Sequence, residues 1–269
     1  MPVKRAFYEQ QNYRSARAGL SSRHAQVLKL AAKYRSGSQI GRVLDLGCLD
    51  GTFSMMLGRQ LAADEVCGVD ISQANVESAQ AKGCRAIVFD LDSGRLPFDD
   101  ASFDFIHVGD VLEHLYNPDF VIEQVSRIIK PKGSLFLSTP NILNLGSRIR
   151  FLFEGGFDFF REPILDYSKA FPSGLQNMHI IVWRYHELEY LLFKNGLCAE
   201  NVYTDLMKPA LKFWGGALLP LLKFQSWQKE RRSGKKGGVD YRRINKIILS
   251  KELLFGRHLI IRANKFKLY

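Results

Sequence analysis

Long hydrophobic segments are missing from this chain. Spanning a bilayer takes about 20 consecutive apolar residues, and no run of that length occurs. Met1 to Leu20 is charged and has no apolar stretch of the kind that marks a secretory signal. We therefore expect a protein that stays in the cytoplasm. No long polar linker divides the 269 residues, which predicts a single domain over residues 1–269.

Cysteine is also scarce. The four cysteines are Cys48, Cys67, Cys84 and Cys198, and their spacing matches neither a metal-ligand set nor a disulfide framework. Three of them fall in or beside predicted strands, where cysteine packs as a small hydrophobic residue. We expect reduced core cysteines, no structural zinc and no other metal site.

Two of the glycines that a dinucleotide site needs are missing. A pyrophosphate-binding turn reads G-x-G-x-x-G, whereas the residues after Gly47 read C-L-D-G-T-F, without the middle and last glycines. The stretch from Val43 to Leu57 instead combines a buried strand, a turn with Gly47 and Gly51, and the start of a helix. Such a turn lets a ligand approach the backbone, and a helix N-terminus favours an anionic group. We predict a small-ligand site here whose ligand is not a dinucleotide.

Strands alternate with helices along the chain, which predicts an α/β fold with a doubly wound sheet. The expected strands cover residues 43–46, 66–70, 85–90, 103–108, 133–141, 198–204 and 258–264. The expected helices cover residues 22–34, a segment from about 51, 72–83, 117–130 and 184–194. In the second and third of these helices the pattern places Phe53, Met56, Leu57, Ala74, Val76 and Ala79 inward.

The strands of this pattern end in residues suited to binding. These residues are Asp70, Asp90, Gly109 and Asp110. The carboxyl ends of parallel strands form the edge of an open sheet where ligands bind. An acid at Asp70 can accept both hydroxyls of a ribose, with a helix-cap contact as the alternative, and Asp90 with the Leu91 N–H can read a base edge.

The start of the chain and two later segments stand apart from this pattern. Residues 4–20 form a polar arm with interspersed aromatics before the helix 22–34, and this region either folds over a pocket or is a surface lead-in. Residues 142–180 are long and aromatic-rich, and loops of this length usually carry function, so we predict a substrate cover that ends near His179. Residues 207–255 form a second, apolar and basic insertion before the last strand.

The net charge of +11 is concentrated toward the end of the chain. Residues 207–269 contain 16 Lys and Arg against 3 acids, a balance of +13, so residues 1–206 sum to −2. Residues 209–236 combine an apolar run with a basic stretch, which is typical of an anchor at an anionic membrane surface. A helical insertion packed on the domain with a solvated basic loop is the alternative. Nucleic acid is not expected, because no stacking-aromatic motif accompanies the charge.

Five motifs in order resemble the class I S-adenosylmethionine-dependent methyltransferases. They are VLDLGCLDG at 43–51, GVDIS at 68–72, FDLDSGRLPF at 89–98, FDFIHVGDVLEHL at 103–115 and IKPKG at 129–133. TPN at 139–141 and the later MHIIVWRYHELEYLLFKNGL are similar to subfamilies that modify glycans, lipids and quinone precursors. NPD at 117–119 and DLDSG at 90–94 are also similar to the methionine-biosynthesis W family, which is thought to work partly through a partner enzyme.

The resemblance implies a seven-stranded Rossmann-like methyltransferase sheet with helices on both faces, and S-adenosylmethionine as cofactor. Backbone groups around Gly47 would hold the methionine carboxylate and ammonium with Asp45 orienting them, Asp70 the ribose, and Asp90 the adenine amine. The predicted cofactor-binding residues are Asp45, Gly47, Cys48, Gly51, Asp70, Ile71, Asp90, Leu91, Gly109 and Asp110. Leu49 departs from the glycine that is commoner in the family, a change we expect the turn to tolerate.

The protein must align an acceptor nucleophile with the methyl group and accept its proton where necessary. The candidate bases are His114, Glu113 and His179, because histidine titrates near neutral pH. Alternatively, Glu113 and His114 begin a helix and pair with neighbours, and His179 pins the cover. We expect O-methylation of a small-molecule, glycan or lipid-linked acceptor. The alternative is a cofactor-binding scaffold or partner subunit with little transferase activity. The oligomeric state stays open.

Overall fold

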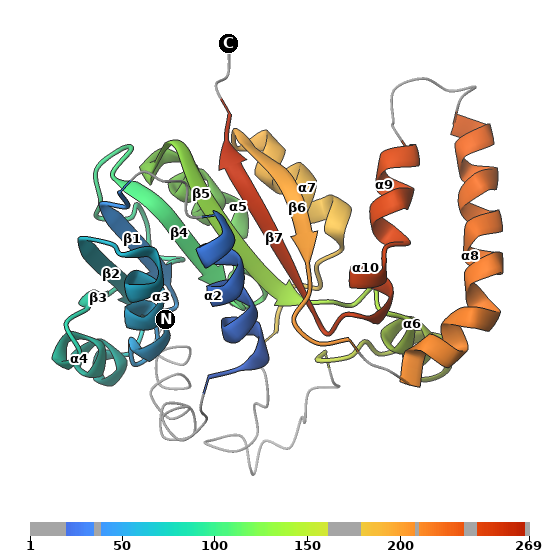
Figure 1. The fold of residues 1–269 in the computed structure, drawn as a ribbon, viewed down its shortest axis with the longest axis horizontal. Helices are drawn as coiled ribbons and strands as arrows, with labels where there is room; N and C mark the ends of the chain where they lie inside the picture. The colour runs from blue at the N-terminus through green and yellow to red at the C-terminus, as the bar shows by residue number, and fades with distance from the viewer. Residues whose placement is uncertain (1–19, 35–38, 161–178, 208–209, 234–240, 267–269) are drawn as a thin grey trace.

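A seven-stranded sheet with helices on both faces makes up the computed structural model, which describes residues 20–34, 39–160, 179–207, 210–233 and 241–266 (Figure 1). The strand order is β3-β2-β1-β4-β5-β7-β6. The strands are β1 (Arg42–Leu46), β2 (Glu65–Asp70), β3 (Arg85–Val88), β4 (Phe103–Gly109), β5 (Ile129–Pro140), β6 (Leu197–Tyr203) and β7 (His258–Lys265). The first five pair in parallel, and β7 runs antiparallel to both β5 and β6.

Most helices connect successive strands, and the last helices lie beyond one edge of the sheet. They are α2 (Ser22–Tyr34), α3 (Thr52–Leu61), α4 (Gln73–Ala81), the 3-10 turn η1 (Leu112–His114), α5 (Pro118–Ile128), α6 (Leu145–Glu154), α7 (Tyr185–Lys194), α8 (Ala210–Ser233), α9 (Tyr241–Ile248) and α10 (Lys251–Phe255). The predicted doubly wound α/β fold is therefore confirmed. The predicted arm at residues 4–20 lies, except for Leu20, outside the described residues.

Alternating strand residues separate two apolar cores, one on each face of the sheet. On β4, Phe105 packs with the buried face of α2 and α3, whereas Ile106 packs with α5 and α7. The same alternation holds on β5, where Phe136 belongs to the first core and Leu137 to the second. Because successive strand side chains point to opposite faces, this pattern fixes the register and brings the strand ends into line.

The ends of β1, β2 and β4 meet at one edge. Leu46 at the end of β1 pairs in register with Val69 of β2 on one side and Val108 of β4 on the other. The turn residues that follow each strand therefore lie beside one another. This is the edge that the sequence pattern predicted as the ligand site.

Several boundaries and inward positions differ from those expected. The helix expected over 117–130 ends at Ile128, because Ile129 already pairs with Phe103 as the first residue of β5. Met56 was predicted inward on α3 but is 38% exposed, and the buried stripe runs through Phe53, Ser54, Leu57, Gly58 and Leu61 instead. Ala74 on α4 is exposed, and Asn75 takes the inward place.

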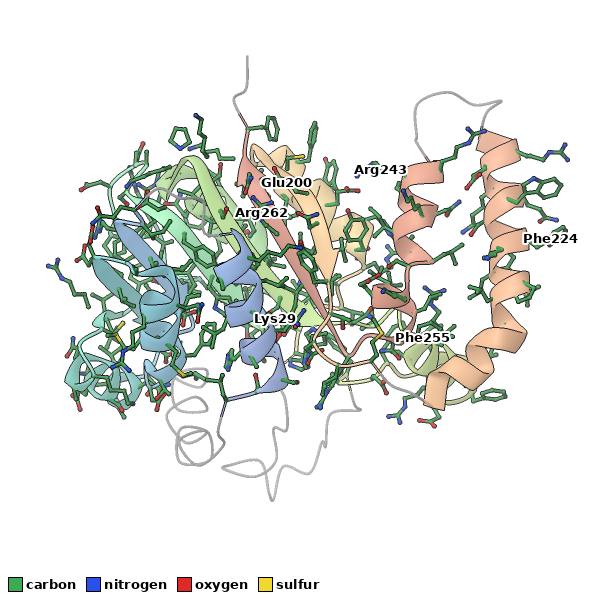
Figure 2. The ribbon with its side chains drawn as sticks, viewed as in Figure 1. Lys29, Glu200, Phe224, Arg243, Phe255 and Arg262 are labelled. Atoms are coloured by element: carbon green, nitrogen blue, oxygen red, sulfur yellow. The ribbon has the colours of Figure 1, made fainter. Side chains whose placement is uncertain are left out.

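The two insertions contain helices. The proposed cover over 142–180 begins with α6, capped by the Asn144 side chain, and its residues 161–178 lie outside the described chain. The second insertion forms α8, α9 and α10, with α8 and α9 standing beyond the β6 edge (Figure 1). Phe224 on α8 points away from α9 (Figure 2). Within the described residues, no helix is long and apolar enough to cross a membrane.

Replacing Phe136 by Ala tests the core on the α2 and α3 face. Phe136 has no exposed surface, and its ring stacks on Phe105 with centroids 5.0 Å apart. We expect the Phe136→Ala variant to lose about 3 to 5 kcal/mol of unfolding free energy in urea denaturation. The control is Phe153→Ala on α6, where the ring is 80% exposed and a change within about 0.5 kcal/mol is expected. Equal losses in the two variants would contradict this account of the core.

Candidate active site

The turn after β1 contains three residues in left-handed backbone conformation. Gly47 and Gly51 have φ of 79° and 73°, and a Cβ on Gly47 would lie 2.7 Å from the Val111 side chain. A Cβ on Gly51 would lie 2.6 Å from Ala79 Cβ. Leu49 also has a positive φ, 49°, where a leucine costs about 1 to 2 kcal/mol. The turn thus accommodates Leu49 in place of glycine at the cost of backbone strain.

Several N–H groups of this turn are already paired within the protein. Gly47 and Cys48 both donate to the carbonyl of Val69, at 2.8 and 3.0 Å. Thr52 at the start of α3 donates its N–H to the Asp50 carboxylate at 3.1 Å. The helix N-terminus therefore already carries one acid, and its role toward the anionic end of a ligand stays a prediction. Carbonyl oxygens of the turn are the better match to a ligand ammonium.

Asp70 lies buried at the end of β2, where the sequence predicted a ribose partner. Its Oδ1 accepts from Ser72 N and Asn75 Nδ2, both at 3.0 Å, and its Oδ2 accepts from Leu49 N at 2.9 Å. Burial raises the pKa of Asp70 above its usual value, although these donors oppose the shift. A carboxylate offers about four acceptor positions, so Oδ2 retains capacity for a ligand hydroxyl. Both the cap contact and the ribose role are compatible with this geometry.

Asp90, Leu91 and Ile71 lie along the same edge. Asp90 is half-buried and accepts from Asp92 N at 3.1 Å, and the Leu91 side chain belongs to the core. Asp92 in turn accepts from Tyr116 N at 3.0 Å, which ties the loop after β3 to the segment after β4. Ile71 is half-buried directly after Asp70. The adenine role of Asp90 and Leu91 stays a prediction.

Asp45 pairs inside the protein. Its carboxylate accepts from Ser54 Oγ at 2.5 Å and lies 2.7 Å from His107 Nδ1, with both side chains of the pair about 3% exposed. The His107 ring in turn lies 4.8 Å from the Phe53 ring, on which His24 stacks at 4.3 Å. Asp45 therefore positions the strand end and the α3 start; its orienting role toward the cofactor stays a prediction.

Arg23 connects α2 to the end of β4. Its guanidinium forms an ion pair with Asp110, a residue in left-handed conformation with φ of 53°. Burial alone would raise the pKa of Asp110, but the Arg23 and His258 charges outweigh it and hold the pKa below its usual value. Gly109 leaves no room for a side chain, because a Cβ there would lie 2.4 Å from His107. α2 is thus part of the site, although the sequence left it open as a surface lead-in.

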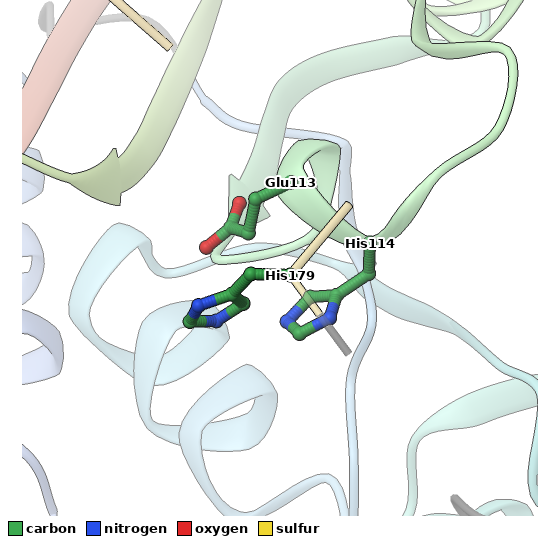
Figure 3. Close-up of side chains that lie close together, drawn as sticks. All are labelled: Glu113, His114 and His179. Atoms are coloured by element: carbon green, nitrogen blue, oxygen red, sulfur yellow. The ribbon is translucent and has the colours of Figure 1, made fainter. Parts of the chain in front are cut away.

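The three predicted catalytic residues come together (Figure 3). One ligand-type atom of each of Glu113, His114 and His179 lies within 4.8 Å of the other two. Glu113 is fully buried, and burial together with Asp110 raises its pKa well above the usual value. The His114 and His179 rings lie 4.7 Å apart. The prediction that these residues share a site is consistent with this geometry, and their chemical roles stay predictions.

A comparison with known families bears on the part of the sheet from β1 to β5 and on the edge at the ends of these strands. Residues 44–137 match the family described as the methyltransferase domain. These residues are a methyltransferase domain of the class I, S-adenosylmethionine-dependent family. The resemblance carried by the five sequence motifs is confirmed. Members of this family are enzymes, and the family implies S-adenosylmethionine as the cofactor of this methyltransferase domain.

Individual relatives agree with this assignment of the methyltransferase domain. The mouse mitochondrial ubiquinone biosynthesis O-methyltransferase is 27% identical over 198 residues, 70% of this chain and 50% of that protein. The 27-O-demethylrifamycin SV methyltransferase of Amycolatopsis mediterranei is 35% identical over 104 residues, 36% of this chain and 37% of that protein. The matched part thus spans half or less of these relatives. A SAM-dependent methyltransferase from Archaeoglobus fulgidus shares the fold, with a TM-score of 0.55, 18% identity and coverage of 90% and 92%.

Sequence reasoning missed several groups at the methyltransferase edge. They are Arg23, His107, Val111 and Thr139. Thr139 donates to Glu113 at 3.2 Å, and the TPN motif that contains it was noted only as a family likeness. Its Asn141 instead clamps the chain before β7, donating to the carbonyls of Leu253 and Gly256 at 2.9 Å. A basic residue on the apolar face of a predicted helix was the sequence signal that could have identified Arg23.

His24 predicts a specific pH dependence of stability. Burial and the neighbouring Arg23 and His107 charges lower the pKa of His24 to about 3, against the opposing effect of Asp45 and Asp110. In the unfolded chain His24 takes up a proton near pH 6.5, so acid favours unfolding between about pH 6.5 and 3 by up to about 1.4 kcal/mol per pH unit. The His24→Gln variant lacks this proton uptake. We therefore expect its stability deficit to shrink by about 1 to 2 kcal/mol from pH 7.5 to pH 5 in urea denaturation.

A matched control is His186→Gln, which removes a half-buried histidine from α7. The change in stability between pH 7.5 and pH 5 is compared between the two variants. A His24→Gln profile that runs parallel to that of the unmodified protein would contradict the proposed cause.

Proposed function

We propose that this protein transfers the methyl group of S-adenosylmethionine to an oxygen atom of a small-molecule acceptor. The observation that carries this proposal is the cluster of Glu113, His114 and His179 at the ligand edge. Glu113 and His114 follow β4, and His179 comes from the segment before α7. Val111, which lies just before Glu113, occupies the space beside Gly47 and brings this segment into contact with the turn after β1. The mouse relative is named an O-methyltransferase and the Amycolatopsis relative a 27-O-demethylrifamycin SV methyltransferase, which supports oxygen as the acceptor atom.

The residues of the edge fit the cofactor. Asp70 Oδ2 keeps acceptor capacity for a ribose hydroxyl. Glycine at position 47 permits both the left-handed turn and the close approach of Val111. S-adenosylmethionine supplies a methyl group already activated on its sulfonium. What the chain contributes is alignment of the acceptor and removal of its proton.

The cluster supplies the proton acceptors. His179 Nδ1 lies 2.9 Å from the Phe159 carbonyl, and only a protonated nitrogen can donate to it, so Nε2 carries the lone pair. That Nε2 is able to take the acceptor's hydroxyl proton as the oxygen attacks. Glu113, held by Thr139, lies beside the two imidazoles in the same cluster.

The Asp70→Asn variant tests the cofactor site. An amide NH2 cannot accept a hydrogen bond, and bonds to a charged group are worth about 1.5 to 3 kcal/mol. We expect the dissociation constant for S-adenosylmethionine, measured by titration calorimetry, to rise about 10- to 100-fold. Asp99→Asn, an exposed carboxylate in the turn before β4, is the matched control and should bind like the unmodified protein.

Unchanged affinity in a folded Asp70→Asn variant would overturn the assignment of the ribose partner. Methyl transfer is then measured separately, with labelled cofactor and extract fractions as acceptors. Cofactor binding without methyl transfer, together with a co-purifying second enzyme, would favour the scaffold or partner-subunit alternative.

We further propose that α8 brings the protein to an anionic membrane surface and that the acceptor is lipid-linked. Leu221, Phe224 and Trp227 are spaced three residues apart on α8 and are 54%, 51% and 48% exposed. The Phe224 and Trp227 rings stack at 5.8 Å, and the Arg231 guanidinium lies over Trp227 at 4.3 Å. Exposed aromatics beside cations are typical of interfacial helices.

Further cations line a hollow that also includes Trp227. A hollow of about 300 Å³ between α8 and α9 is lined by Lys223, Trp227, Arg242 and Lys246 among others. With Glu230 also in the lining, three cations face one acid, so the hollow keeps a positive balance that suits a phosphate headgroup. Each cation near an anionic surface contributes about 1 kcal/mol. These contacts favour a peripheral position at the inner membrane face over a purely cytoplasmic one.

Sedimentation with vesicles tests this proposal. We expect the protein to pellet with phosphatidylcholine vesicles containing phosphatidylglycerol at low salt and to be released at high salt. The double variant Phe224→Ser, Trp227→Ser should pellet at least tenfold less. Tyr190→Ser, Phe193→Ser is the matched control, because these exposed aromatics have the same spacing on α7. Failure of the unmodified protein to pellet at low salt would remove the membrane proposal.

A further inference from the structure

Phe159 has a backbone conformation that is unusual for a bulky side chain. It lies in the turn after α6, in which the Phe160 N–H donates to the Phe157 carbonyl at 3.1 Å. Its φ of 70° is in the left-handed region, which favours glycine. Strained backbone of this kind persists only where surrounding contacts fix it, and it clusters at functional sites.

Two side chains at the start of β7 hold the Phe159 ring. The His258 ring lies 5.3 Å from it at an interplanar angle of 40°, and the Arg257 guanidinium also lies 5.3 Å from its centre. The Asp158 N–H donates to Ser147 Oγ at 3.0 Å, which ties the same turn to α6. Contacts with β7 and α6 thus fix the turn in spite of the strain at Phe159.

His258 is itself fixed by Asp205, which follows β6. The Asp205 side chain has no exposed surface, and it accepts from His258 N at 3.0 Å and from Ser22 Oγ at 2.7 Å. His258 Nδ1 lies 2.8 Å from Asp205 Oδ2 and carries a proton when it donates to this carboxylate. Burial alone would raise the pKa of Asp205, but the hydrogen bond and charge of His258 outweigh it and hold the pKa below its usual value. Asp205 therefore fixes the orientation of the His258 ring.

The Phe159 carbonyl connects this arrangement to the proposed base. It accepts from His179 Nδ1 at 2.9 Å, so the proton of a neutral His179 is on Nδ1 and the lone pair is on Nε2. The hydrogen bond made by one ring nitrogen sets which of the two carries the proton. The direction of the Phe159 carbonyl, and with it this choice of nitrogen, depends on the left-handed backbone of Phe159.

We propose that His258, held by Asp205, is a positioning residue for His179. It keeps Phe159 in the conformation in which the Phe159 carbonyl holds the His179 proton on Nδ1. This inference rests on the proposed methyl transfer and deepens it, because only a nitrogen with a free lone pair takes up the hydroxyl proton of the acceptor. His258 acts through Phe159 and takes up no proton from the acceptor itself.

Nitrogen NMR of the full chain, without cofactor or acceptor, tests this inference. With ¹⁵N-labelled histidine at about pH 8.5, above the usual titration range of histidine, the two ring nitrogens of His179 should give widely separated signals, as one neutral tautomer does. In His258→Leu the two signals should move toward each other, because the proton is then shared between the nitrogens. The signals are assigned by their loss in His179→Gln.

Further variants separate the ring contact from effects on folding. His258→Phe retains an aromatic ring against Phe159 and should restore the separated signals, and equal loss in His258→Phe and His258→Leu would overturn the role of the ring contact. Phe159→Leu should act like His258→Leu, and it decides if His258→Leu fails to fold, because the turn lies outside the sheet. Phe153→Leu, which changes an 80% exposed phenylalanine of α6, is the matched control and should leave the His179 signals unchanged.

Methyl transfer distinguishes this inference from the proposed function. With labelled cofactor and an extract fraction that the unmodified chain methylates, His258→Leu should lower kcat about tenfold, part of the roughly 10²- to 10⁴-fold that a positioned base contributes, and leave KM for S-adenosylmethionine unchanged. Separated His179 signals in a folded His258→Leu variant would overturn the positioning role and leave the transferase function standing. The expected shift of these signals without methyl transfer by the unmodified chain would retain the positioning of His179 and overturn the transferase function.

Discussion

The Asp70 carboxylate joins three parts of the chain at the ligand edge of the sheet. It receives N–H groups from the turn after β1 and from the start of α4, and the Asn75 side chain completes the set. These bonds satisfy a carboxylate that the fold buries, which would otherwise be costly. They also hold Leu49 in a left-handed conformation, because strained backbone persists where several contacts fix it. The shape of the turn after β1 thus depends on the same acid that is predicted to bind the ribose.

Two acids along this edge each have a partner from another element. His107 faces Asp45 and Arg23 faces Asp110, so two acids in neighbouring strands do not lie unpaired next to each other. His107 comes from β4 and Arg23 from α2, so both lie outside the turn that contains Gly47 and Gly51. α2 therefore contributes more than apolar cover, since its buried residues place Arg23 at the end of β4. Glu113 is the exception among these acids, because one of its oxygens lacks a partner among the described residues.

The sequence predicted those features that depend on neighbours along the chain. Apolar runs ended by an acid or a glycine located the strand ends at Asp70 and Gly109, and the motif order gave the family. The ion pair of Arg23 with Asp110 and the pair of Asp45 with His107 join residues far apart in sequence, and no local pattern reports such pairing. Met56 was placed wrongly because one residue on a helix is a rotation of about 100°, which moves a side chain off the buried stripe.

The strand order explains how one edge serves two ligands. The ends of β1, β2 and β3 carry the predicted cofactor groups, whereas Glu113 follows β4 and Thr139 lies near the end of β5. The contact between Gly47 and Val111 joins the two halves, so the cofactor turn and the acceptor groups share one packed boundary. Residues on strand ends are held more precisely than residues on long loops, which favours the alignment that methyl transfer requires. His179 alone comes from an insertion, and its two backbone neighbours bonded to Glu113 extend the rigid edge to it.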